Sequence, residues 1–379
     1  MELIIGVAVG LIILVLLIVV HELGHAVAAR RNGVTVEEFG IGFPPRAWSR
    51  KLKNGVVFSL NWLPLGGFVK LQGEHDAASN KGDYGAASFW QKTKILLAGV
   101  VTNWLVAAIL LTVLAVTGLP KVLPNQFVVS GDTTTVQQPV EIVALVPKYP
   151  AQKAGLKEGD KIIRFDGQAV PTTQALIDLT KSNRGKTIDV VYARNGVEIV
   201  TKTTLRDDKT GSVFGAGLGQ RELTKSTWSA PLVGIAATGQ FTWATIQGLG
   251  NLVGNLASGI FLQLSPNATI RSEAGANLKT VGDSVAGPIG ILGTIFPQAE
   301  RAGPTQLVFL TAIISLTLAV MNILPIPALD GGRWFVTAMF RLTRKKLTKD
   351  REEKIQVAGF FVLMGLVILV TVADVTKLF

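Results

Sequence analysis

The chain has 379 residues, of which 48% are hydrophobic and only 17% charged, and its mean hydropathy is +0.41. This composition excludes an intrinsically disordered chain, and the bunching of apolar residues into long uncharged runs argues against a wholly soluble protein. The chain contains no cysteine, which excludes disulfides, thiol nucleophiles and cysteine-ligated metal sites. The net charge of +11 comes without a basic stripe interleaved with aromatic residues, so we expect basic membrane loops and no nucleic-acid partner.

Four apolar segments are long enough to cross a bilayer, which takes roughly 20 helical residues. They cover residues 3–29, 95–119, 307–329 and 355–372. A signal peptide is the alternative for the first segment, but no basic region precedes it and its apolar run is too long, so we expect a retained helix. A fifth stretch, residues 231–264, is rich in Gly, Thr, Asn and Gln, and we interpret it as an interfacial helix, with a fifth span as the alternative.

The basic residues predict the orientation of these spans. Residues 30–94 carry ten Lys or Arg against five acids, and residues 341–354 carry seven against three. Both loops are therefore expected in the cytoplasm, with the N-terminus, residues 120–306 and the C-terminus on the other face. Four spans satisfy this alternation and five do not.

Within the long segment, residues 139–205 predict a small α+β module. We expect strands over 140–146 and 161–165, a helix over 173–181 and a hairpin at Asn195-Gly196, a pair that supplies both positive-φ positions of a type I′ turn. The run from Ala154 to Phe165 resembles the central signature of PDZ domains in bacterial envelope proteases. Such domains add a peptide to a sheet edge, which implies peptide recognition or restricted access.

The strongest chemical signal is the H-E-x-x-H motif of His21, Glu22 and His25 at the end of the first span. Positions i and i+4 lie on one helical face, one turn apart, which suits two imidazoles on one zinc ion, while the Glu can reach a metal-bound water. From the composition, we expect this motif by chance about once in a thousand such chains. Ionisable groups in a span also usually mark function.

A catalytic zinc takes three protein ligands, so a third is required. The remaining histidine, His75, lies in a polar loop and is a poor candidate, whereas Asp330 follows Pro325 and Pro327, which break the third apolar segment. Broken helices at membrane depth are tolerated where they line a cavity or are buried in protein. The alternative for Asp330 is an ordinary Asp-Gly turn. Both candidate groups lie near the cytoplasmic ends of their spans, so they can share one depth.

These motifs together resemble the site-2 protease family of intramembrane zinc metalloproteases, in the bacterial branch that includes the regulator of sigma-E protease. The resemblance adds a G-x-x-x-N motif ending at Asn103, Gly287-Pro288-Ile289-Gly290 and an N-x-x-P-x-P-x-L-D-G motif beginning at Asn322. Two features depart from that pattern: Val100 stands where a proline often occurs, and there is one PDZ-like module instead of two.

The resemblance implies one Zn²⁺ per chain, held by His21, His25 and Asp330, with Glu22 as the catalytic residue. It implies substrate contacts at Asn322, Asn103, Gly66 and Gly67, the two glycines lying in a membrane-associated β-hairpin at 58–71. For Asn322, capping of the broken helix is an equal alternative.

The expected fold is a polytopic α-helical membrane protein with about four transmembrane helices, a membrane-associated β-hairpin and an inserted α+β PDZ-like domain. Its parts are the spans at 1–30, 95–119, 307–340 and 355–379, the cytoplasmic-side loops at 31–94 and 341–354, the PDZ-like domain at 120–230 and an interfacial region at 231–306. The expected location is the bacterial cytoplasmic membrane, with single-span membrane proteins as substrates, a peptide or C-terminus at the PDZ-like domain, and the lipid bilayer as a further partner.

The predicted activity is zinc-dependent hydrolysis of peptide bonds in or near transmembrane segments, for example in anti-sigma factors or signal-peptide remnants. A metal transporter is one alternative, since His and Asp in spans also suit ion passage, but it leaves Glu22 and the PDZ-like module unexplained. A catalytically silent scaffold that captures partners through the PDZ-like module is the other.

Overall fold

A computed structural model describes residues 2–194, 196–208 and 211–378 and divides the chain into two compact units. We call residues 1–112 with 234–379 the membrane unit, and residues 113–233 the inserted unit. The predicted fold class is confirmed: long apolar helices are combined with β-sheets, one of which belongs to an inserted α+β domain.

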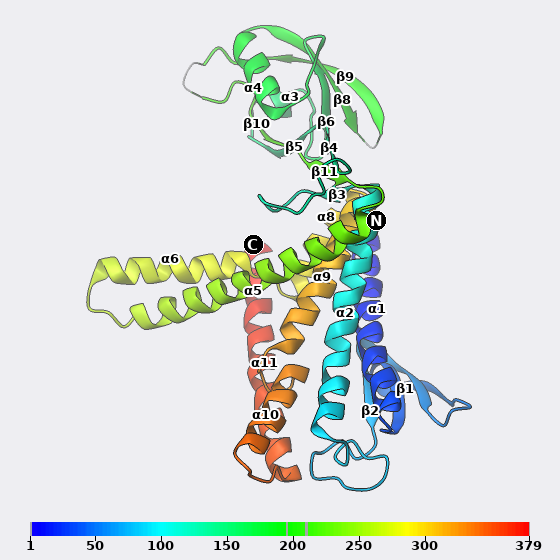
Figure 1. The fold of residues 1–379 in the computed structure, drawn as a ribbon. Coiled ribbons are helices and arrows are strands. Elements are labelled where there is room, and N and C mark those ends of the chain that lie inside the picture. Colours follow the sequence, from blue (N-terminus) through cyan, green and yellow to red (C-terminus); the bar gives the residue numbers. More distant parts are fainter. Residues whose placement is uncertain (1, 195, 209–210, 379) are drawn as a thin grey trace. The chain divides into compact units, whose positions relative to one another are not determined.

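The membrane unit is built on four helices that are long and apolar enough to cross a bilayer, among the residues that the structure describes. They are α1 (Glu2–Arg31), α2 (Phe89–Thr117), α9 (Pro304–Ile323) and α11 (Lys349–Leu378), and they run alongside one another in Figure 1. Their outward side chains are apolar and exposed, as expected of surfaces that face lipid. A shorter helix, α10 (Asp330–Leu342), lies between α9 and α11 in the chain.

Residues 230–301 form helices that none of the four candidate spans includes. They are α5 (Ala230–Leu262), α6 (Ala268–Ser284), the short α7 (Pro288–Gly290), a π-helical turn η1 (Ile291–Ile295) and α8 (Phe296–Arg301). The N-terminus of α7 is capped by α11, because the Gly290 N–H donates to Asp374 Oδ2 at 2.8 Å. A Cβ atom on Gly10 of α1 would lie 2.6 Å from the Phe296 ring, so α8 packs closely on α1.

Between α1 and α2, β1 (Val36–Lys51) and β2 (Val57–Leu71) form an antiparallel two-stranded sheet with several register shifts. The expected hairpin segment 58–71 is therefore β2, and it pairs with a long first strand that the sequence analysis did not identify. Residues 67–71 of β2 pair with residues 36–41 of β1, and Ile41 also pairs with Leu60. Among the described residues, 67–71 have no strand on their other side, so this segment is a free edge of the sheet.

The inserted unit holds an α+β domain with its own core. Its main sheet has the order β10-β5-β6-β8-β9, with β7 paired to β6, and its core includes Ile142, Phe165 and Leu176, each fully buried. A second sheet, β3-β11-β4, joins the two ends of the insertion. The elements are β3 (Leu119–Pro120), β4 (Thr134–Gln137), β5 (Val140–Leu145), α3 (Pro150–Lys153), β6 (Lys161–Phe165), β7 (Gln168–Ala169), α4 (Thr173–Ser182), β8 (Thr187–Arg194), β9 (Val197–Thr204), β10 (Ala216–Gly219) and β11 (Glu222–Lys225).

The expected strands at 140–146 and 161–165 and the expected helix at 173–181 are present as β5, β6 and α4. The expected hairpin joins β8 to β9, which pair from Arg194 and Val197 outward. Of its two turn residues, Asn195 lies outside the described residues and Gly196 has a positive φ of 80°.

Candidate metal centre

Helix α1 places His21 and His25 one turn apart on the same face. The helix runs without interruption through the polar motif and ends at Arg31, where two arginines in its last turn favour the helix dipole. The two imidazole rings meet edge to face with centroids 4.8 Å apart. Both histidines are buried, with 9% and 11% of their side-chain surface exposed.

The prolines of the third apolar segment place Asp330 at the start of a new helix. Helix α9 ends at Ile323, short of the predicted residue 329, because Leu324 precedes Pro325 and adopts an extended conformation. Helix α10 then begins at Asp330, where a negative side chain is favourable. Cβ atoms on Gly331 and Gly332 would lie 2.1 and 1.9 Å from backbone carbonyl oxygens of residues 323–326. Only glycine permits this tight return of the chain.

Helix α11 contacts the loop of residues 324–329, which leads into Asp330. The Gln356 side-chain oxygen accepts a hydrogen bond from the Ala328 backbone N–H at 2.6 Å. A Cβ on Gly359 would lie 2.4 Å from Pro327, so α11 and the loop are in close contact. Ala328 itself has φ of 76°, a conformation that is strained for a residue with a side chain. These contacts hold the loop in one conformation.

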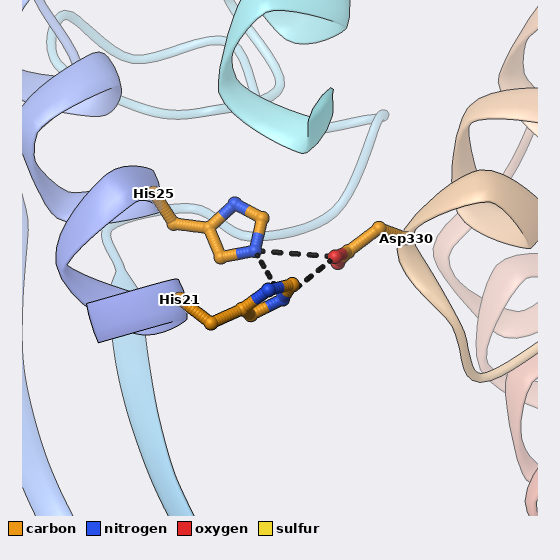
Figure 2. A group of neighbouring side chains, drawn as sticks. All are labelled: His21, His25 and Asp330. Atoms are coloured by element: carbon orange, nitrogen blue, oxygen red, sulfur yellow. Dashed lines mark hydrogen bonds and ion pairs between the residues drawn. The ribbon is translucent and has the colours of Figure 1, made fainter. Parts of the chain in front are cut away.

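The three donor atoms form a nearly equilateral triangle, shown in Figure 2. His21 Nε2 lies 3.1 Å from Asp330 Oδ2, His25 Nε2 lies 3.2 Å from the same oxygen, and the two Nε2 atoms are 3.1 Å apart. Tetrahedral zinc with bonds of about 2.0–2.1 Å places its ligand atoms roughly 3.3 Å from one another. Among the described residues, this is the group of His and carboxylate side chains that could hold a metal ion. The donor set and spacing fit zinc.

Helix α2 sets the orientation of both imidazoles. His25 Nδ1 lies 2.8 Å from the Ile95 carbonyl oxygen, which can only accept a hydrogen bond, so Nδ1 carries the proton. The Nε2 atom of His25 then keeps a free lone pair, which points toward the centre of the three candidate metal ligands. Asn103 is fully buried with its amide 3.3 Å from His21 Nδ1, and its Oδ1 atom has no hydrogen-bond partner in the described part of the chain. A 180° rotation of this amide lets Oδ1 accept from His21 Nδ1–H, which frees the His21 Nε2 lone pair as well.

Two glycines allow α1 and α2 to approach at the motif. A Cβ on Gly24 would lie 2.3 Å from Thr102 Oγ1 and 2.8 Å from the Ala98 carbonyl oxygen. A Cβ on Gly99 would lie 2.4 Å from His25 Nε2 and 2.6 Å from His21 Nε2. The α2 backbone therefore forms the wall behind the two imidazoles, and the glycine of the G-x-x-x-N motif is required by this contact.

Glu22 lies between the histidines and the free edge of β2. The Val69 backbone lies near its carboxylate, which places this edge of segment 67–71 beside the site. A Cβ on Gly67 would lie 3.7 Å from Glu22 Cγ, so Gly67 is adjacent to the same side chain. The neighbouring Gly66 has φ of 148° and lies against the Phe43 ring.

A cavity of about 200 Å³ opens onto the donor atoms. It brings together His21, Glu22 and Asp330 with the two asparagines singled out from the sequence, Asn103 and Asn322. Its remaining lining residues are Ile18, Leu318, Ala328 and Leu329. The space is small, and five polar side chains converge on it against four apolar ones.

His75 lies elsewhere, as the sequence analysis expected, with its Nε2 atom 3.5 Å from Glu353. Sequence reasoning missed three contributors to the site: the Ile95 carbonyl, the Val69 backbone and Gln356. The first two are backbone groups that give no signal in residue identity, and Gln356 lies in an ordinary helical segment.

The chain is similar to known proteins over nearly its whole length. The family model of Peptidase family M50 matches residues 9–366. A protein of Clostridium perfringens assigned as a zinc metalloprotease is 32% identical over 95% of both chains. The zinc metalloprotease RasP of Geobacillus kaustophilus is 27% identical over 96% of both, and the regulator of sigma-W protease RasP of Bacillus subtilis is 26% identical over 96% of both.

Among solved structures, the PDZ domain of an SdrC-like protein from Listeria monocytogenes matches 24% of this chain and 93% of its own, with 26% identity and a TM-score of 0.20. The family match covers nearly the whole chain and includes every element that supplies a donor atom. The chain therefore belongs to peptidase family M50 and is a multi-pass membrane zinc metalloprotease.

Proposed function

We propose that the protein hydrolyses peptide bonds in or near the transmembrane segments of other membrane proteins. In this proposal His21, His25 and Asp330 hold one Zn²⁺, and Glu22 is the catalytic residue. The observation that carries the proposal is the triangle of donor atoms at 3.1–3.2 Å, with Glu22 in the same cavity. The donors come from a candidate span and from the helix that directly follows another, so the chemistry would take place at membrane depth.

Each polar residue of the site has a part in this reaction. Bound zinc supplies Lewis acidity toward the scissile carbonyl and makes a nearby water acidic. Glu22 accepts the proton of the attacking water and then passes it to the leaving amine, and the Val69 backbone lies near its carboxylate. Asn103 orients His21, and the Ile95 carbonyl orients His25.

The free edge of β2 would hold the substrate. A transmembrane helix hides its carbonyl groups in i to i−4 hydrogen bonds, so it must unwind before it is cut. An extended segment could pair with residues 67–71, as peptides do with other exposed sheet edges. Gly66 and Gly67 would then let the substrate backbone approach Glu22, which is adjacent to Gly67. Asn322, in the cavity wall, would donate to the substrate backbone.

The inserted unit would select substrates. We assign residues 120–230 to a PDZ-like domain that binds a peptide or C-terminus, or excludes bulky domains, on the extracytoplasmic side. The Bacillus relative is named as a regulator of sigma-W, which supports single-span regulatory proteins as substrates, with anti-sigma factors and signal-peptide remnants as candidates.

The proposed location is the bacterial cytoplasmic membrane with the active site toward the cytoplasm. This orientation rests on the basic loops at 30–94 and 341–354. Because the chain contains no cysteine, single-cysteine variants report topology directly. In intact spheroplasts, an impermeant maleimide should label Lys181→Cys of the inserted unit but not Lys53→Cys of the β1–β2 loop. The reverse pattern would overturn the orientation.

The catalytic assignment is tested with a tagged single-span substrate and purified protein in detergent. We expect Glu22→Gln to keep one zinc per chain and to lose cleavage by about 10²- to 10⁴-fold, the usual contribution of a general base. Removing zinc with a chelator should abolish cleavage, and restoring zinc should recover it. Cleavage by Glu22→Gln at the unmodified rate would contradict the proposed role.

A further inference from the structure

A second cavity in the membrane unit lies away from the metal centre. It has a volume of about 490 Å³, within the range of small-molecule sites. Its walls come from the loop before α2, the first turn of α2, the end of α10 and the junction of α10 with α11.

The wall of this cavity is strongly basic. Five cationic side chains line it against a single acid, Asp76, which is paired with the buried Lys92. The Arg341 guanidinium lies 5.3 Å from the Phe89 ring centre. Lys345 and Lys346 are exposed and have no acidic partner among the described residues.

The remaining cation, Lys349, begins helix α11, so the N-terminus of that helix, whose first turn also carries Asp350 and Glu352, lies at the cavity wall. Its distance of 3.8 Å to Glu353 is that of a weak, exposed ion pair. A helix N-terminus together with several cations favours a phosphate group. The cavity therefore has the chemistry of an anion site that the family's reaction does not require.

The position of the cavity indicates where the phosphate comes from. Two candidate spans, α2 and α11, both begin at its wall, and their starts lie at the same end of the bundle in Figure 1. Beside it, Trp90 is 71% exposed and Leu342 is 84% exposed. Exposed tryptophan at the start of a span is typical of the level of lipid headgroups. Basic pockets between helix ends at this level are suited to acidic lipids.

We propose that this cavity binds the phosphate headgroup of an anionic phospholipid, with the acyl chains lying along the apolar surfaces of α2 and α11. Lys345, Lys346 and Arg341 would contact the phosphate, and the α11 N-terminus would complete the site. The bound lipid would hold the end of α10, the helix whose first residue is Asp330.

The test uses native mass spectrometry of the full chain in neutral detergent, titrated with phosphatidylglycerol or with phosphatidylcholine. We expect phosphatidylglycerol to bind and phosphatidylcholine not to bind. Lys345→Gln/Lys346→Gln should weaken phosphatidylglycerol binding about 30-fold, which corresponds to about 2 kcal/mol, or about 1 kcal/mol for each basic residue. Because both lysines are exposed, the variant should keep its fold, and its zinc content and circular dichroism verify this.

Arg351→Gln/Lys354→Gln is the matched control, because it removes the same charge from the same region without touching the cavity wall. It should change the affinity less than about twofold, as expected for exposed charges screened by solvent. Equal affinities for phosphatidylglycerol in the two double variants would overturn the site. Binding of glycerol phosphate as tight as that of phosphatidylglycerol would overturn the assignment to a lipid.

Discussion

The substitution Gly99→Ala tests whether the α2 backbone shapes the metal centre. In the structure, a Cβ at this position would lie 2.4 Å from His25 Nε2 and 2.6 Å from His21 Nε2. Ordinary van der Waals contacts of a Cβ atom begin at 3.4 Å. One or both imidazoles must therefore retreat by about 1 Å, whereas zinc sites tolerate deviations of about 0.2 Å in ligand distance. We expect zinc affinity to fall by at least about 10- to 100-fold.

The assay is zinc competition with a chromophoric chelator, followed by the zinc content of the dialysed protein. Cleavage of a single-span substrate should fall with zinc occupancy and recover in part at high zinc, because the ligands themselves are intact. Gly239→Ala, in α5, is the matched control, since a Cβ there has open space around it. It should bind zinc and cleave like the unmodified protein.

An unchanged zinc affinity in Gly99→Ala would refute the reasoning, because it would mean that the imidazoles do not lie against α2. The same holds if Gly239→Ala and Gly99→Ala lose zinc equally, since the loss would then follow from any added methyl group. A loss of zinc with an unchanged circular dichroism spectrum in Gly99→Ala alone supports the close contact.

Two further predictions concern ionic contacts away from the donors. Arg333→Gln leaves Glu352, whose side chain is only 4% exposed, without its cation, and should lower the stability of the protein by about 3–5 kcal/mol. Arg164→Gln breaks the exposed ion pair with Glu198 and should lower the stability by less than about 1 kcal/mol. Equal unfolding midpoints of the two variants in denaturant would contradict this prediction. In the inserted unit, hydrogen bonds from the Ser229 and Thr227 side chains lower the pKa of Asp132 to about 2. Because the pKa of Asp132 is lower in the folded protein than in the unfolded chain, the ionised carboxylate stabilises the folded state. This contribution is fully present above about pH 4 and is lost as the pH falls to about 2. Asp132→Asn should remove that part of the pH dependence in thermal unfolding between pH 5 and 2, and an unchanged slope would contradict the assignment.

The sequence predicted the parts of this protein whose signals are local. The long apolar runs predicted the four spans, and Pro325 predicted the break that precedes Asp330. The spacing of His21 and His25 predicted their shared face, because the helical period is fixed by the backbone. In the inserted unit, the pattern predicted β5, β6 and the hairpin between β8 and β9, whereas β7 and β10 of the same sheet were not predicted.

The sequence did not predict the parts that depend on backbone groups brought together from distant segments. The Ile95 carbonyl orients His25 from 70 residues away, and nothing in the identity of an isoleucine indicates this role. The same is true of the Val69 backbone, since strand β1 and its pairing with β2 were not recognised. The basic cavity was also missed, because Lys92 and Lys346 fall within residues 30–94 and 341–354, whose charges were interpreted only as signals of membrane topology.

The arrangement around the donors is set by contacts that do not involve a metal. His25 is held by a helix carbonyl, and Asp330 is held by a turn that only Gly331 and Gly332 can form. Such preorganisation places three electron-rich atoms within 3.2 Å of one another, an arrangement that is unfavourable until a cation compensates it. Part of the packing energy of α1 against α2 is therefore used to hold the donors together. The binding of zinc should recover that energy, and Gly24 permits the close packing because a Cβ there would overlap Thr102 and the Ala98 carbonyl.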